Sequence, residues 1–311
     1  MTPEELDALV RTQAFAFLDE LALRHGQALP RDLLLQGFLF QGQRVPLLGP
    51  QGIFKPAVLP KSLGIPLSIT TAPPVEGKPR PYEDSVDSSG LIRYRYRGTD
   101  PQHHENAGLR KAMWQRTPLI YFFGLMEGRY AAAWPSFIVG DNPGGLTFTV
   151  AVDDRRVVTA GAGEVAEDGS AGRRAYITTV TQQRLHQASF RERVLAAYQD
   201  CCAVCRLRHR ELLDAAHILD DKDPQGEPWV SNGLSLCKIH HAAFDKNILG
   251  INPDRIISIR EDILEEEDGP MLEHGLQDFD GKPLLVVPTS EHLRPNRDFL
   301  ARRYEAFRRA G

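Results

Sequence analysis

The sequence predicts an α+β protein with a β-rich N-terminal part and a small C-terminal part that contains paired Cys and His residues. Three observations support this prediction. Residues 4–25 carry apolar side chains at helical spacing, residues 30–165 contain short apolar runs broken by Gly and Pro, and residues 198–251 hold the Cys/His pairs. A chain of 311 residues is also long enough to form two domains with separate cores.

The composition excludes several classes of protein. With 42% hydrophobic and 25% charged residues, the chain lies near the average for globular proteins, which argues against disorder, collagen and coiled coil. The chain contains no apolar run of the roughly 18 to 20 residues that span a bilayer. Its first residues are acidic, whereas a signal peptide begins with basic residues. We therefore expect a cytoplasmic protein that does not bind a membrane.

The N-terminal part is expected to contain one helix followed by a barrel-like sheet. Residues 4–25 predict an amphipathic helix that ends at Gly26 and packs on the rest of the protein or on a second copy. Repeated short strands predict a β-rich barrel or strongly curved sheet, and 106–114 predicts a short helix among them. The apolar runs are 33–35, 65–69, 91–96, 119–123, 137–139 and 146–150.

A boundary is expected where the composition becomes small, polar and Gly-rich, at residues 160–174. Residues 176–180 fit a strand of either domain, and a helix is expected at about 182–199. The expected segments are an N-terminal helix at 1–29, a β-rich domain at 30–165, a linker at 166–181 and a second domain at 182–311.

Two Cys/His pairs in the C-terminal part have the spacing of zinc ligands. Cys202 and Cys205 are separated by two residues, and Cys237 and His240 repeat this spacing. Zinc prefers four tetrahedral nitrogen or sulfur ligands, and closed structural sites use such pairs. The alternative is that the thiols are buried apolar side chains, but the second pair argues against it. The sequence therefore predicts a structural Zn²⁺, and Cys201 is expected to be only a neighbour of the site.

The residues from about 198 to 255 resemble the HNH nuclease family, whose fold is a ββα-metal finger. The resemblance is carried by Cys202-Ala-Val-Cys205, Asp214-Ala-Ala-His217, Asn232-Gly-Leu-Ser-Leu-Cys237 and His240-His241. It implies that His217 activates water, that Asn232 braces the loop between the strands, and that His241 binds a catalytic Mg²⁺ or Mn²⁺. A neutral imidazole can take a proton from water at physiological pH, and a divalent ion can neutralise charge that develops on a phosphodiester.

One position departs from the family pattern. Many members carry an Asp immediately before the base, where this chain has Ala216 and the nearest acid is Asp214. Side chains alternate along a strand, so Asp214 shares a face with Ala216, while His217 points to the other side. We expect Asp214 to be a poor substitute for the missing acid. The sequence leaves open whether His241 holds the ion with water and phosphate or whether an acid such as Asp245 contributes.

Residues 50–150 resemble, more weakly, a divergent SRA domain, a PUA-like barrel that flips a modified cytosine out of the duplex. The resemblance is carried by Tyr82-Glu-Asp84, Asp87-Ser-Ser-Gly90 and Tyr94-Arg-Tyr96-Arg-Gly98, followed by Asn106. It implies that aromatic rings sandwich the base while an acid reads its edge. The candidates are Tyr82, Asp84 or Asp87, and Tyr94 or Tyr96. The alternative is that both later tyrosines face the core from one strand and that the acids cap turns.

These features together predict a modification-dependent DNA endonuclease that binds double-stranded DNA carrying a modified cytosine. Two alternatives are an HNH nuclease that needs no modification and an inactive zinc-containing DNA-binding protein. A single finger commonly nicks one strand, so cleavage of both strands would indicate a homodimer. The net charge of −4 does not oppose DNA binding, because phosphate affinity follows local charge and basic clusters surround the expected nuclease. These clusters lie at 173–174, 191–193, 206–210 and 302–309.

Overall fold

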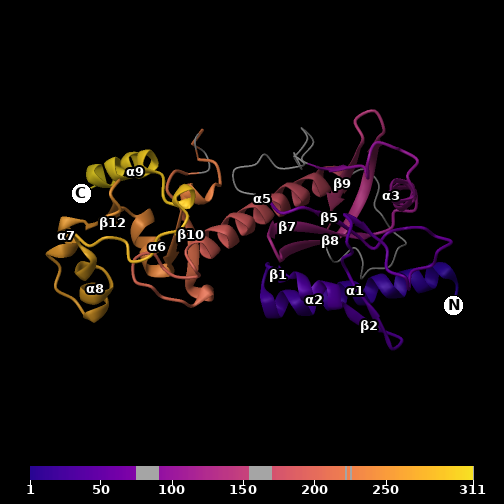
Figure 1. Cartoon of the computed structure of the whole chain (residues 1–311), viewed down its shortest axis with the longest axis horizontal. Coiled ribbons are helices and arrows are strands. Elements are labelled where there is room, and N and C mark those ends of the chain that lie inside the picture. The colour runs from indigo at the N-terminus through magenta and orange to yellow at the C-terminus, as the bar shows by residue number, and fades with distance from the viewer. Residues whose placement is uncertain (75–90, 154–169, 221–222, 225, 311) are drawn as a thin grey trace. The chain divides into compact units, whose positions relative to one another are not determined.

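The computed structural model describes residues 1–74, 91–153, 170–220, 223–224 and 226–310 (Figure 1). The chain divides into two compact units, Met1–Ser189 and Phe190–Gly311. The boundary between them falls within α5 (Ser170–Ala197). Among the described residues, none of the helices combines the length and the apolar character needed to cross a membrane.

The first unit begins with the helix that the sequence predicted. Helix α1 (Pro3–His25) starts at a capping box, in which the Thr2 hydroxyl accepts from the Glu5 N–H and the Glu5 carboxylate accepts from the Thr2 N–H. It ends at Gly26, whose φ of 66° favours glycine. Its apolar face packs on the rest of the unit, so the helix contributes to this unit's own core.

A curled, half-barrel sheet forms most of the first unit. Its seven strands run in the order β4-β5-β7-β8-β9-β6, and β1 pairs with β8. Strands β5 and β7 are parallel, and the other pairs are antiparallel. The Tyr94 hydroxyl of β6 lies 3.4 Å from the Thr70 carbonyl oxygen of β5, so two strands far apart in the order approach each other. The strands are β1 (Leu29–Pro30), β4 (Ile53–Phe54), β5 (Ser68–Thr71), β6 (Ile92–Arg95), β7 (Leu119–Met126), β8 (Arg129–Asn142) and β9 (Thr147–Val152).

Two apolar cores cover the two faces of this sheet. Tyr121 and Phe123 of β7 pack in one core with α3 (His104–Trp114) and Leu185 of α5. Ile120 and Phe122 face the other core, which includes α1, α2 (Arg31–Gln36) and the hairpin of β2 (Phe38–Phe40) and β3 (Gln43–Val45). Because both faces of β7 are buried, this strand is apolar throughout instead of alternating with polar residues.

Two expectations about local structure were wrong. Residues 33–35 do not form a strand. They lie in helix α2, which runs between Pro30 and Gly37. Residues 176–180 are helical as well, since α5 runs through the described part of the expected linker. A β-branched run such as Ile177-Thr-Thr-Val180 favours a strand by propensity, but burial of one helical face against the sheet outweighs it.

The second unit contains a ββα arrangement, as the resemblance implied. Strands β10 (Leu213–His217) and β11 (Gly233–Cys237) form an antiparallel hairpin, and α6 (Lys238–Asp245) follows directly and packs on it. The core gathers apolar residues from the hairpin, α5 and α6. The remaining elements are β12 (Leu249–Ile251), β13 (Ile257–Ile259), α7 (Glu261–Leu264), α8 (Pro270–Gly275) and α9 (Arg297–Ala310), with short 3-10 turns at η1 (Arg210–Leu212), η2 (Val230–Asn232), η3 (Gln277–Phe279) and η4 (Glu291–Leu293).

Candidate functional site

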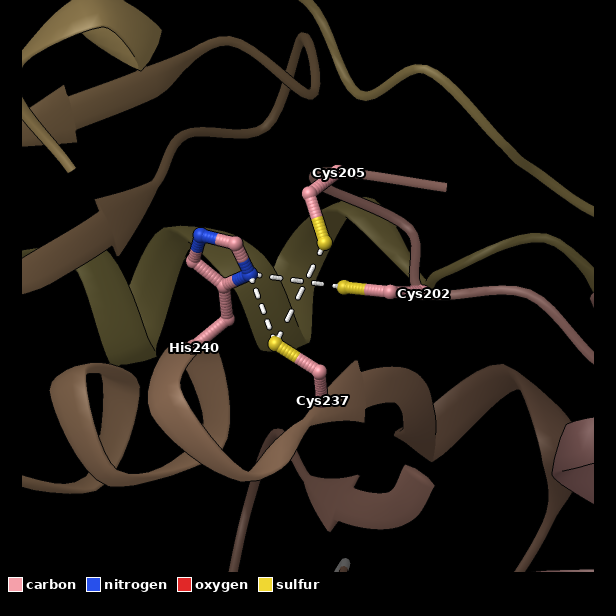
Figure 2. Close-up of side chains that lie close together, drawn as sticks. All are labelled: Cys202, Cys205, Cys237 and His240. Atoms are coloured by element: carbon pink, nitrogen blue, oxygen red, sulfur yellow. Dashed lines mark hydrogen bonds between the residues drawn. The ribbon is translucent and has the colours of Figure 1, made fainter. Parts of the chain in front are cut away.

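The four expected zinc ligands converge on one point (Figure 2). Cys202 and Cys205 lie in the turn after α5, Cys237 ends β11, and His240 lies in the first turn of α6. Their donor atoms all lie within 4.8 Å of one another. The Cys237 Sγ atom is 3.1 Å from His240 Nδ1 and the Cys205 Sγ atom is 4.0 Å from Cys237 Sγ. Tetrahedral zinc with bonds of about 2.3 Å would separate sulfur ligands by roughly 3.8 Å, so the arrangement fits this ion.

The His240 ring is oriented for metal binding by a backbone group. Its Nε2–H donates to the Gly275 carbonyl oxygen of α8 at 2.8 Å, which leaves Nδ1 facing the sulfur atoms. Burial alone would lower the pKa of His240, but Cys202 and Cys237 raise it to about 10. Hydrogen bonds from Cys202 and Cys205 hold the pKa of Cys237 far below its ordinary value. Zinc binds thiolates and neutral imidazole, so binding of the ion to this cluster would release protons.

His217 occupies the last position of β10, opposite Gly233 of β11. Its ring stacks on Phe190 of α5, with centroids 4.0 Å apart and an interplanar angle of 14°. A Cβ atom on Gly233 would come within 2.9 Å of the Phe190 ring, so glycine is needed for this close approach. The position of the imidazole is therefore set by a helix that precedes the hairpin.

Asn232 is completely buried and holds the segment that follows His217. Its Oδ1 accepts from the Leu219 N–H at 2.9 Å. Its Nδ2 donates to the carbonyl oxygens of Leu219 at 3.1 Å and Glu227 at 3.2 Å. One side chain thus ties both ends of the connection between β10 and β11.

His241 lies between two carboxylates on the exposed side of α6. Its Nδ1 is 3.4 Å from Asp214 Oδ2, and its Nε2 is 3.3 Å from Asp245 Oδ2. Lys238 Nζ lies 2.5 Å from the same Asp214 oxygen. Partial burial raises the pKa of Asp214, but the hydrogen bonds and charges of Lys238 and His241 outweigh it and hold the pKa below its ordinary value. Ala216, where the family carries an acid, is fully buried.

The two later tyrosines of the N-terminal candidate set both face the core of the sheet. Tyr94 and Tyr96 are each 6% exposed, while Arg93 and Arg95 point to the other, exposed side of β6. The Tyr96 ring stacks on Phe148 at 4.4 Å. Tyr82, Asp84 and Asp87 lie outside the residues that the structure describes.

The Tyr96 hydroxyl belongs to a polar network. It donates to the Asp141 carboxylate and accepts from Arg110 Nη2 at 3.2 Å, and Arg110 also pairs with Asp141 at 2.6 Å. Burial, reinforced by the Asp141 carboxylate, raises the pKa of Tyr96. Tyr96 is thus held on both its ring and its hydroxyl by neighbours within the unit.

A cavity of about 320 Å³ lies beside these tyrosines. Thr71, Tyr94 and Tyr130 contribute to its wall, and no carboxylate side chain lines it among the described residues. Arg31, Arg95 and Arg97, all exposed, also border it. The described part of the cavity wall is therefore partly aromatic, carries no carboxylate and includes basic residues at its border.

The sequence did not indicate three residues that contact the expected site residues or line the cavity. Phe190 stacks on His217, Gly275 accepts from His240, and Thr71 lines the cavity. Sequence reasoning also undervalued Asp214, which reaches His241 from the face that it shares with Ala216. The small residue at 233 was the one signal in the sequence that another group approaches the hairpin closely. No spacing rule links Phe190 or Gly275 to the motif.

Comparisons with known proteins agree with the C-terminal geometry. The model of the HNH endonuclease family matches residues 202–252, which include the Cys/His cluster, His217, Asn232 and His241. No curated protein matches the chain.

Two solved structures are similar to the chain. The modification-dependent TagI restriction endonuclease is 17% identical and has a TM-score of 0.28, with 78% of this chain and 81% of that chain covered. The Type IV phosphorothioation-dependent restriction endonuclease ScoMcrA is 16% identical and has a TM-score of 0.22, with 62% and 47% covered. TM-scores this low do not establish a shared overall fold. Because its residues 202–252 form an HNH endonuclease domain, the chain is a metal-dependent DNA endonuclease.

Proposed function

We propose that this endonuclease cuts double-stranded DNA that carries a modified cytosine. The C-terminal unit hydrolyses the phosphodiester, and the N-terminal unit binds the modified base after its extrusion from the duplex. The observation that carries the nuclease part is the ββα hairpin, which places His217 at the end of β10, Asn232 just before β11 and His241 on the following helix. The two units correspond, in this proposal, to a nuclease and a reader.

His217 is the proposed general base. A neutral imidazole accepts the proton of an attacking water near physiological pH, and stacking on Phe190 limits the ring to one orientation. Asn232 holds the loop after His217, so the base keeps its position while DNA binds. Cys202, Cys205, Cys237 and His240 stabilise the hairpin through a structural Zn²⁺.

His241 and Asp245 are the proposed holders of the catalytic Mg²⁺ or Mn²⁺. They lie one helical turn apart on α6, with the Asp245 carboxylate 3.3 Å from His241 Nε2. The Asp214 oxygen nearest His241 already accepts from Lys238, so Asp214 orients the His241 ring through Nδ1. A divalent ion held there would neutralise charge on the phosphate and assist the departing oxygen.

The inactive alternative rests on the missing acid at Ala216. The Asp245 carboxylate lies beside His241 Nε2 and can supply negative charge for a divalent ion, while Asp214 orients the His241 ring from the other side. This arrangement favours an active nuclease over an inactive DNA-binding protein.

The reader part of the proposal rests on the curled sheet and its cavity. Extruding a base costs a few kcal/mol, which stacking and hydrogen bonds in a fitted cavity can offset. The described part of the cavity wall is partly aromatic and carries no carboxylate, and its basic residues suit the flanking phosphates.

Plasmid cleavage tests both parts. The full chain is incubated with Mg²⁺ or Mn²⁺ and plasmids that carry cytosine, 5-methylcytosine, 5-hydroxymethylcytosine or phosphorothioate linkages. We expect cleavage of the plasmids with modified bases at least 10 times faster than of the plain one. Equal cutting of all plasmids would remove the reader part, and a preference for phosphorothioate would replace the modified base with a modified backbone. Cleavage of both strands that rises with the square of protein concentration would indicate a homodimer.

Variants assign the general base. His217→Ala should reduce cleavage by about 100-fold or more while DNA affinity stays the same. His292→Ala removes an exposed histidine of η4 and serves as the matched control. Cleavage by His217→Ala at the rate of the control would show that another group is the base.

A further inference from the structure

The wall of the N-terminal cavity contains two adjacent threonines whose hydroxyls are buried without a partner. The Oγ1 atoms of Thr70 and Thr71 have no hydrogen-bond partner among the described residues, and both residues line the cavity. Thr71 is 7% exposed. Burying a hydroxyl without a hydrogen bond is unfavourable, so such groups are rare unless a ligand satisfies them. Both threonines are therefore candidates for a ligand contact.

The direction of the Thr71 side chain follows from the register of β5. Strand side chains alternate, so Thr71 shares a face with Ile69, which packs in the same core as Tyr94 and Tyr96. The neighbouring Thr70 shares the opposite face with Ser68, whose hydroxyl bonds to the Leu47 carbonyl oxygen. Both threonines line the cavity, but the side chain of Thr71 is thus the one on the face that carries the cavity's tyrosines.

The charge distribution around the cavity identifies the class of ligand. Its described wall offers hydroxyls and aromatic rings but no carboxylate side chain, which suits an uncharged planar ring. The exposed Arg31, Arg95 and Arg97 add positive charge, which suits an anion attached to that ring. A neutral base on a phosphodiester backbone combines both properties.

We propose that the Thr71 hydroxyl hydrogen-bonds to the edge of the extruded base and so determines the specificity of this cavity. The inference rests on the proposed function, because it takes the cavity as the site of the base. Tyr96 is stacked on Phe148 and held by Asp141 and Arg110, so it shapes the cavity and does not sandwich the base. Tyr94 and Tyr130 provide the aromatic part of the wall that meets the base.

The test compares two isosteric substitutions on adjacent residues. Thr71→Val and Thr70→Val are made in the full chain that carries His217→Ala, so that DNA binds without being cut. Fluorescence anisotropy measures binding to one duplex with a central 5-methylcytosine and to the same duplex with cytosine. Thr71→Val should weaken binding to the methylated duplex by about 5- to 30-fold and leave the plain duplex unchanged. Thr70→Val should change neither.

Thermal unfolding separates a ligand contact from a structural role. Because Thr71→Val removes an unsatisfied buried hydroxyl and keeps the shape, its melting temperature should equal or exceed that of the parent. Retained preference for the methylated duplex in a folded Thr71→Val chain would overturn the inference and leave the proposed function standing. If Thr71→Val does not fold, Thr71→Ser, which keeps a hydroxyl, is compared with Thr71→Ala, which lacks one. Equal preference for the methylated duplex in these two variants would overturn the inference. A parent chain without preference would overturn both proposals.

Discussion

The C-terminal hairpin and the N-terminal sheet place their candidate residues by different means. In the hairpin and the turn before it, the residues that could hold zinc come from a short stretch of chain, and Cys237 and His240 lie within one turn of each other. In the sheet, the cavity is lined by residues from Arg31 to Tyr130 that come from several separate elements. Sequence spacing therefore identifies the first site, while the second exists only because the sheet curls. The two regions should respond to substitution in correspondingly different ways.

The largest effect is expected from loss of a ligand in the Cys/His cluster. Cys237→Ser should lose the structural zinc and unfold the hairpin, because metal binding supplies much of the folding free energy of a unit this small. Zinc content should fall from about one ion per chain to near zero, and cleavage should fall at least 100-fold. Calorimetry should show that the thermal unfolding transition of the first unit is unchanged.

Cys201→Ser is the matched control for this substitution. Cys201 is buried beside the cluster, but its Sγ contacts the Gln199 carbonyl oxygen and Arg208 and none of the four expected ligands is its hydrogen-bond partner. It should keep the zinc. Zinc loss in both variants would mean that the cluster is wrongly assigned.

A smaller effect is expected from Asn232→Ala. The substitution leaves the Leu219 N–H and carbonyl groups without their buried partner, which costs about 2 to 3 kcal/mol of unfolding free energy. Since the loop after His217 loosens, cleavage should fall by about 10- to 100-fold. Denaturant unfolding and cleavage rates measure both effects. Asn252→Ala removes an Asn that caps the turn between β12 and β13, and it should leave the cleavage rate near that of the parent.

Gly52→Ala tests the curvature of the sheet. A Cβ atom there would lie 3.0 Å from the Tyr94 hydroxyl and 3.2 Å from the Thr70 carbonyl oxygen, so the contact between β6 and β5 must shift. We expect about 5-fold weaker binding of a methylated duplex, measured by anisotropy, with zinc content unchanged. Gly144→Ala meets only an ordinary contact at 3.6 Å and should bind like the parent. Equal binding by both variants would separate the cavity from DNA recognition.

An effect of similar size is expected from Phe190→Leu. Aromatic stacking contributes about 0.5 to 1.5 kcal/mol beyond buried area, so loss of the ring on His217 should slow single-turnover cleavage by about 3- to 10-fold. Phe299→Leu removes an aromatic ring from the same core without touching His217. Similar stability losses but different cleavage rates would support the positioning role, and equal cleavage rates would contradict it.

Much of the C-terminal site could be predicted because its residues have fixed spacing in elements of known geometry. A Cys at the end of a strand and a His three residues later in a helix face the same point whatever the rest of the chain does. The sequence could not show how Asp214 contacts His241, because that contact depends on how α6 packs on β10. Alternation along β10 places Asp214 on the face of Ala216, but the position of α6 decides what an acid on that face can reach.

The N-terminal sheet shows where pattern reasoning is weaker. Five of the six apolar runs contribute to strands, because short β-branched and aromatic runs bounded by Gly and Pro favour extended structure. The exception is 33–35 in α2, where a run of three leucines carries no periodicity that separates helix from strand. The order of the strands and the parallel pair β5–β7 were beyond the sequence pattern, since both depend on long-range pairing.

The sequence by itself determined that this protein has an α1 helix, a β-rich N-terminal part and an ordered set of Cys, His and Asn residues typical of a zinc-stabilised nuclease hairpin. These features depend on local spacing and propensity, which covalent geometry imposes on any fold. Only the tertiary structure decided that Phe190 stacks on His217, that Tyr96 is tied to Asp141, and that Thr71 lines a cavity. Such contacts join residues far apart in the chain, and they arise from how apolar faces pack and how the sheet curls.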